Sequence, residues 1–66
     1  MAAVRASNVR RRDLVCVHNR WVEVKASRHD LRGGMAEVVL VFRSAPSLRV
    51  SALDVLWVVR GGKRRR

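Results

Sequence analysis

The chain has 66 residues, of which 15 are Lys or Arg and five are Asp or Glu, so its formal net charge at pH 7 is +10. A domain of this size buries only ~60% of the surface that its unfolded chain exposes. It is a poor scaffold for a catalytic cleft, which must bury and orient several polar groups. Length and charge therefore favour a small binding protein over an enzyme.

The positive charge is concentrated at the two ends of the chain. Residues 1–12 contain four arginines and no acid, and residues 61–66 contain one lysine and three arginines, again with no acid. Residues 13–60 carry seven basic and five acidic residues. Runs of like charge stay solvated until they meet a polyanion. We therefore expect a basic N-terminal arm, a nearly balanced domain and a basic C-terminal tail with these boundaries.

The first two predicted strands cover residues 14–18 and 20–26, with a polar turn at Asn19 between them. The first strand is almost continuously apolar, and its single cysteine, Cys16, is interpreted as a small core residue in a reducing compartment. The second strand alternates between apolar and polar residues, which is typical of a strand with one buried face. This alternation places Trp21 on the face away from the core.

The third predicted strand, residues 35–43, also alternates, and its pairing with the second strand can be tested on the sequence. Placing Lys25 opposite Glu37 joins opposite charges and brings Trp21 opposite Val41. Both faces of the pair then match, whereas a shift of one residue would bury polar side chains. We expect this register.

The tip of the resulting hairpin is predicted over residues 27–34. Gly33 and Gly34 permit the positive φ angles of a tight turn. Arg28 and Arg32 would project from this loop.

Two shorter strands complete the predicted domain. A turn around Pro46 leads into a strand at residues 48–50, and the last strand covers residues 55–60. Between them, residues 51–54 place a serine three positions before an acid, which predicts a single helical turn. Five short strands would leave open edges as a flat sheet. We therefore expect them to close into an all-β barrel.

The segments DLVCV, RWVEVKAS, AEVVLVF and LRVSALDVLWVV resemble an SH3-like barrel of the KOW or Tudor kind over residues 13–60. The chain is similar to the RNA-polymerase-interacting domain of the CarD family, in which a D-x-V opening and a V-x-V-P-A segment recur. Here Ser51 stands where that family has proline. The chain is also similar to the N-terminal domain of elongation factor P, but its hairpin tip lacks the lysine that is modified there. The resemblance implies a five-stranded SH3-like barrel with one short helical turn before the last strand.

An apolar strip is expected outside the barrel, formed by Trp21, Val39 and Val41. Burying a side chain of this size gains ~1.5 to 3 kcal/mol over leaving it exposed. The strip should therefore be covered by the N-terminal segment, by a second copy or by a partner protein. Trp57 is instead expected in or near the core.

No metal, cofactor or catalytic site is expected. Cys16, His18 and His29 lack the spacing of a zinc site, and no third group orients Cys16 and His18 as a nucleophilic pair. The two Gly-Gly pairs lack the flanking residues of a phosphate-binding loop. No apolar stretch approaches the ~20 residues of a membrane span, and the N-terminus lacks a signal-peptide pattern. We expect a cytoplasmic protein without a small-molecule substrate.

The leading hypothesis is a nucleic-acid-binding protein that contacts mainly phosphates of DNA or RNA, in transcription, translation or nucleoid organisation. Arginine suits such contacts because its planar guanidinium binds phosphate in a bidentate manner. The expected contacts are Arg10, Arg11, Arg12, Arg28, Arg32, Lys63, Arg64, Arg65 and Arg66. The alternative is a protein-interaction module that docks on RNA polymerase, the ribosome or its own copy through Trp21, Val39 and Val41.

Overall fold

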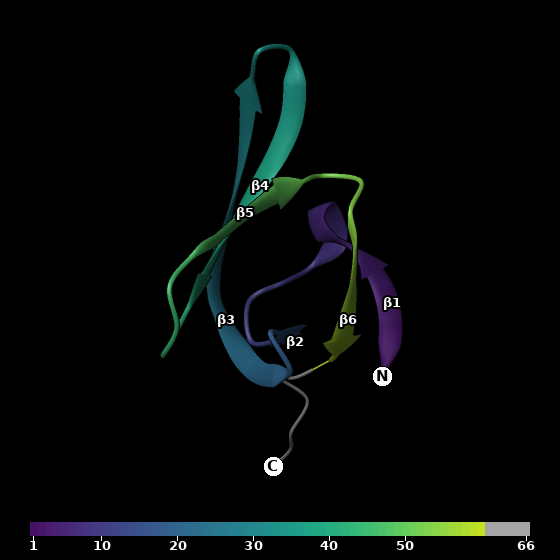
Figure 1. The fold of residues 1–66 in the computed structure, drawn as a ribbon, viewed down its shortest axis with the longest axis vertical. Coiled ribbons are helices and arrows are strands. Elements are labelled where there is room, and N and C mark those ends of the chain that lie inside the picture. Colours follow the sequence, from purple (N-terminus) through teal and green to yellow (C-terminus); the bar gives the residue numbers. More distant parts are fainter. Residues whose placement is uncertain (61–66) are drawn as a thin grey trace.

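Six antiparallel strands and one 3₁₀ turn form the fold in the computed structural model, which describes residues 1–60 (Figure 1). Within the sheet the strand order is β1-β6-β2-β3-β4-β5. The prediction of an all-β domain is confirmed. The elements in chain order are β1 (Ala2–Arg5), η1 (Ala6–Asn8), β2 (Leu14–Val17), β3 (Arg20–Arg32), β4 (Met35–Phe42), β5 (Leu48–Ser51) and β6 (Val55–Val59).

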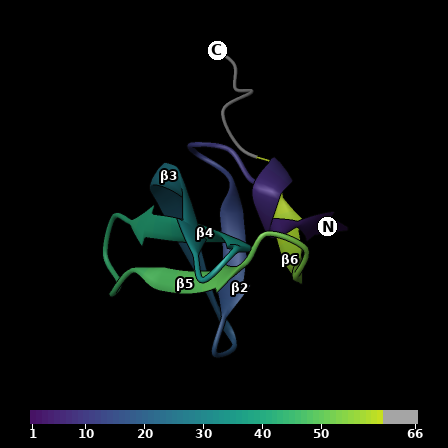
Figure 2. The same ribbon diagram turned by 90° about the horizontal axis from the view of Figure 1, so that it is seen from above.

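The sheet curves around the core but remains open (Figure 2). Within residues 1–60, no hydrogen-bonded pairing joins the two edge strands, β1 and β5. The prediction of a closed five-stranded barrel is therefore wrong. The N-terminal segment supplies a sixth strand, which pairs with β6 from Ala2 opposite Val58 to Arg5 opposite Val55.

Most of the predicted N-terminal arm belongs to the folded domain. Besides β1, this segment contributes Ala6 and Val9 to the core, where both are buried. The Ser7 backbone N–H donates to the carbonyl oxygen of Ala52 over 3.2 Å, which ties η1 to the turn after β5. The prediction of a solvated arm over residues 1–12 considered only the charge of its arginines. It did not consider that the apolar residues between them could pack in the core.

Alternation along the strands supplies the core. In β4 the buried residues are Val38, Leu40 and Phe42, which lie on the face predicted from the sequence. In β3 the buried residues are Val22 and Val24. The complete buried apolar set is Ala6, Val9, Val15, Val22, Val24, Val38, Leu40, Phe42 and Val58.

The register between β3 and β4 differs from the prediction. Glu37 lies opposite Asp30, and Lys25 lies in a β-bulge without a partner in β4. The φ angles of Gly33 and Gly34 are +58° and +80°, as in a two-residue turn with both central residues left-handed. This tight turn fixes the register from the tip. Residues 27–32, which were predicted as part of the loop, continue β3, and the hairpin extends beyond the rest of the sheet (Figure 1).

The predicted helical turn before the last strand is instead a hydrogen-bonded turn, and the 3₁₀ turn of residues 1–60 lies near the N-terminus. The Asp54 carboxylate accepts the Ser51 backbone N–H over 3.2 Å, and the Ser51 hydroxyl oxygen accepts the Leu53 N–H over 3.2 Å. These residues therefore satisfy each other's polar groups without starting a helix.

Candidate nucleic-acid interface

Arginine side chains form ion pairs with four of the five carboxylates inside the domain. The ion pairs join Asp13 to Arg60 over 2.6 Å, Glu23 to Arg43 over 3.5 Å, and Glu37 and Asp30 to Arg49 over 2.9 and 3.3 Å. Residues 1–60 contain eleven basic residues, and these pairs use three of them. The other eight have no ion-pair partner within residues 1–60: Arg5, Arg10, Arg11, Arg12, Arg20, Lys25, Arg28 and Arg32.

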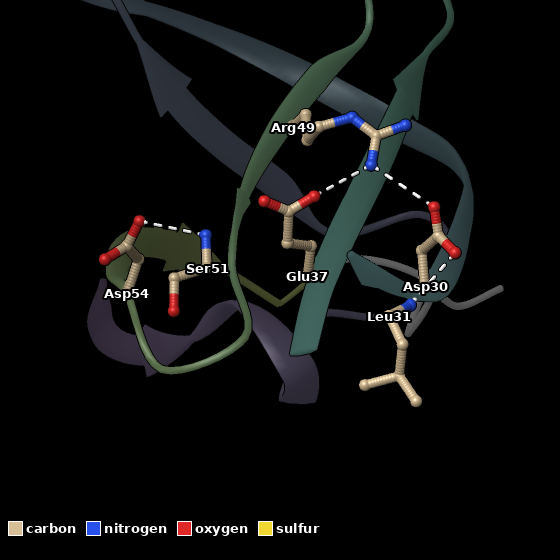
Figure 3. A network of polar contacts seen from close by, with 6 residues as sticks. All are labelled: Asp30, Leu31, Glu37, Arg49, Ser51 and Asp54. Atoms are coloured by element: carbon tan, nitrogen blue, oxygen red, sulfur yellow. Dashed lines mark hydrogen bonds and ion pairs between the residues drawn. The ribbon is translucent and has the colours of Figure 1, made fainter. Parts of the chain in front are cut away.

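Arg49 bridges two acids that lie directly opposite each other (Figure 3). Asp30 on β3 faces Glu37 on β4, and like charges in this position repel. The Arg49 guanidinium donates a hydrogen bond to each carboxylate. These two hydrogen bonds raise the pKa of Arg49 above its ordinary value, and the bond to Glu37 has the larger effect. The charge of Arg49 is therefore engaged within the sheet.

Buried Asp13 holds the turn that carries Arg10, Arg11 and Arg12. Asp13 is only 2% exposed, and its carboxylate accepts the backbone N–H of Arg10 over 2.9 Å and the guanidinium of Arg60 over 2.6 Å. Arg12 has a left-handed φ of +79°, which is uncommon for a residue with a side chain. The three exposed arginines therefore project from a turn of defined shape.

This turn packs against β3 at the bulge. The Arg12 N–H donates to the carbonyl oxygen of Val24 over 2.8 Å, and the Val24 N–H donates to the carbonyl oxygen of Asp13 over 2.8 Å. Lys25, the next residue of β3, is exposed. Four cations thus gather where the turn crosses the strand. We call Arg10, Arg11, Arg12 and Lys25 the basic turn cluster.

Two further cations follow along β3. Arg28 lies opposite Val39 and Arg32 opposite Met35, and both arginines are exposed on the outer face of the hairpin. A strand advances ~3.4 Å per residue, so Arg28 lies roughly 10 Å beyond Lys25 along the strand. Asp30 lies between Arg28 and Arg32 on the same face and, with Glu37, is paired with Arg49. Arg28 and Arg32 therefore lie on either side of this ion-pair network, between the basic turn cluster and the hairpin tip.

Five of the nine residues predicted to contact nucleic acid lie in the described part of the chain. All five are exposed and without an ion-pair partner there: Arg10, Arg11, Arg12, Arg28 and Arg32. The other four, Lys63, Arg64, Arg65 and Arg66, lie outside the described residues. Lys25 was missed because the predicted register paired it with Glu37.

The predicted apolar strip is divided in the structure. Trp21 pairs with β2 rather than with Val41, and the Glu23–Arg43 ion pair lies between Trp21 and Val41 along the outer face. Val39 and Val41 are half-buried. Trp57 is 56% exposed, so the prediction that it belongs to the core is wrong.

Other kinds of site find less support in residues 1–60. They contain no group of three or more His, Cys, Asp or Glu side chains that could hold a metal ion. They also contain no helix long and apolar enough to cross a membrane.

A mostly apolar pocket of about 250 Å³ lies between the β2–β3 turn and the β4–β5 loop. Its lining is Val17, His18, Arg20, Val22, Ala45, Pro46, Ser47 and Leu48.

Comparisons with known proteins identify no relative of this chain. No family model matches it, and no significant match was found among curated proteins or solved structures. Its function is therefore inferred from the charges and surfaces described above.

Proposed function

We propose that this protein binds nucleic acid, mainly through the phosphate backbone, and that it acts in transcription, translation or nucleoid organisation. The observation that carries the proposal is the division of the charges. Three arginines pair with four of the five carboxylates, and eight cations of residues 1–60 keep no ionic partner there. A surface with so little compensating negative charge attracts polyanions.

The basic turn cluster and the cations along β3 would make the phosphate contacts. Hydrogen bonds to Val24 and Asp13 fix the backbone of the turn, so little ordering cost remains when its arginines bind. Guanidinium groups bind phosphate in a bidentate manner. Contacts of this kind position the protein without reading bases, so we expect weak sequence preference.

A kinship with SH3-like barrels of the KOW or Tudor kind belongs to the same proposal. The strands from β2 to β5 follow one another in the sheet, and β6 returns beside β2. This arrangement supports the kinship inferred from the sequence, with β1 as an additional edge strand.

Neutral replacement of the arginine turn tests the proposal. The triple variant R10S/R11S/R12G should bind duplex DNA more weakly and with a shallower dependence on salt, by about 0.9 in slope for each phosphate that the variant no longer neutralises. Glycine suits position 12 because it adopts the left-handed φ of Arg12 without strain. Fluorescence anisotropy of a labelled duplex between about 50 and 200 mM salt measures both quantities.

The matched control is R10K/R11K/R12K, which keeps the three charges and should retain most of the salt dependence. Affinity of the unaltered protein that does not change with salt would contradict the proposal. Equal slopes for the unaltered protein and the neutral variant would exclude the turn as the interface.

Exposed Trp21 and half-buried Val39 and Val41 favour a second candidate function, a protein-interaction module that docks on RNA polymerase, the ribosome or a second copy. This candidate predicts that Val41→Glu abolishes association, whereas deletion of residues 61–66 weakens it only slightly. The nucleic-acid proposal predicts the reverse ranking. Sedimentation of each variant, alone and with purified RNA polymerase or ribosomes, distinguishes the two.

A further inference from the structure

We infer that the outer face of β6, β2 and β3 binds single-stranded nucleic acid by stacking bases on Trp57 and Trp21. This inference rests on the proposed function and adds a substrate class to it, single strands in preference to duplexes. The two indoles are 56% and 45% exposed, although tryptophan is strongly buried on average. Their exposure therefore requires an explanation that phosphate binding alone does not give.

Strand pairing places both tryptophans on one face. Val15 of β2 lies opposite Val58 of β6, and both are buried, so the alternate residues of these strands point outward. Cys16 lies opposite Trp21, and one further step of the β2–β6 register brings Trp57 level with Cys16. The two tryptophans are then separated by two strand spacings, roughly 10 Å.

Small and apolar neighbours leave this face accessible. Ala3 lies opposite Trp57 on β1, and its methyl group covers little of an indole ring. On β6, Val55 is 61% exposed and extends the apolar surface. The carboxylate on this part of the sheet, Glu23, is paired with Arg43. A base with its phosphate would therefore meet aromatic surface without an unpaired negative charge beside it.

The size and charge of the face favour a nucleic acid over a second copy. Together with the two exposed valines of β6, Val55 and Val59, the exposed parts of the indoles amount to roughly 400 Å², about half of the ~800 Å² that each partner buries in a stable protein interface. Exposed Arg5 lies opposite Val55 on β1 and has no ion-pair partner within residues 1–60, so two copies joined through this face would bring like charges close together. Base stacking needs only the face of one ring per base, and Arg5 beside this face would attract the backbone.

Intrinsic fluorescence tests the inference, because the chain has two tryptophans and no tyrosine. We expect oligo(dT) and oligo(rU), added to the full chain, to quench the tryptophan emission, and a matched duplex to quench it much less. Trp21→Leu and Trp57→Leu should each weaken single-strand binding about 5- to 150-fold. Each should change duplex binding by less than about twofold. Trp21→Phe and Trp57→Phe keep a stacking ring and should retain most of the affinity.

Three results would overturn the inference. If both nucleic acids bind with the expected salt dependence but the emission is unchanged, phosphate binding stands and stacking is excluded. The same holds if the leucine variants lose duplex and single-strand affinity equally. If the protein alone sediments as a dimer that Trp57→Leu dissociates, the face is an interface between copies. Absence of binding to either nucleic acid at low salt would instead refute the proposed function itself.

Discussion

Replacing Arg60 with alanine should lower the free energy of unfolding by about 2 kcal/mol. The Asp13 side chain is 4% exposed, and removal of Arg60 would leave its charge buried without a cation. Breaking a buried ion pair in this way costs ~3 to 5 kcal/mol. We expect less here because the Arg60 side chain is 46% exposed, so water replaces part of the ion pair. Urea unfolding at 25 °C, followed by tryptophan fluorescence, measures the change.

Arg43→Ala is the matched control. It breaks the Glu23–Arg43 pair, whose side chains are 38% and 65% exposed and whose atoms are 3.5 Å apart. Pairs of this kind contribute ~0 to 1 kcal/mol. Equal destabilisation by the two variants would show that Asp13 does not depend on Arg60.

Binary alternation along the strands made much of the fold predictable. The sequence placed Val38 and Leu40 on the buried face of one strand, and Val22 and Val24 on the buried face of its neighbour. All four assignments are confirmed. They depend on the two-residue period of a strand, which a sequence displays directly. The position of one strand along another is not displayed in this way.

The predicted register was wrong because the turn at the hairpin tip, rather than one charge pair, determines the pairing of the two strands. Opposing Lys25 to Glu37 would have contributed ~0.2 to 1 kcal/mol, but it required an eight-residue loop at residues 27–34. The structure instead closes the hairpin at Gly33 and Gly34, which extends the pairing on both strands. A β-bulge at Lys25 then restores the apolar face of β3. Turn geometry and added backbone pairing outweighed one exposed ion pair.

The candidate site was predictable in composition and less so in position. Unpaired arginines were identified because their numbers exceed those of the acids. The ordered turn was not foreseen because it depends on Asp13, whose partner Arg60 lies 47 positions away in the sequence. The prediction for Trp57 was wrong because β6 is apolar on both faces in the sequence. In the structure Leu56 and Val58 lie on the more buried face, and Trp57 lies on the exposed face. Whether a strand face is covered depends on elements distant in the sequence.

The largest loss of stability is expected for Leu40→Ala. Leu40 is fully buried in β4, where it pairs with Ser27 of β3 and Leu48 of β5. Such truncations cost ~2 to 5 kcal/mol because they remove apolar packing and leave a cavity. A chain of this length has roughly 3 to 10 kcal/mol of stability in total. Thermal unfolding should show a midpoint lower by about 10 to 30 °C.

The control is Leu31→Ala near the hairpin tip, where the leucine is 73% exposed and the expected change is within about 0.5 kcal/mol. Leu40→Met keeps most of the volume and should cost less than about 1.5 kcal/mol. Since β4 holds the part of β3 that carries Arg28 and Arg32, Leu40→Ala should also weaken nucleic-acid binding at temperatures where it unfolds the domain. If Leu40→Ala costs no more than Leu31→Ala, then β4 does not form the centre of the core, and the cations along β3 lose the scaffold on which their arrangement depends.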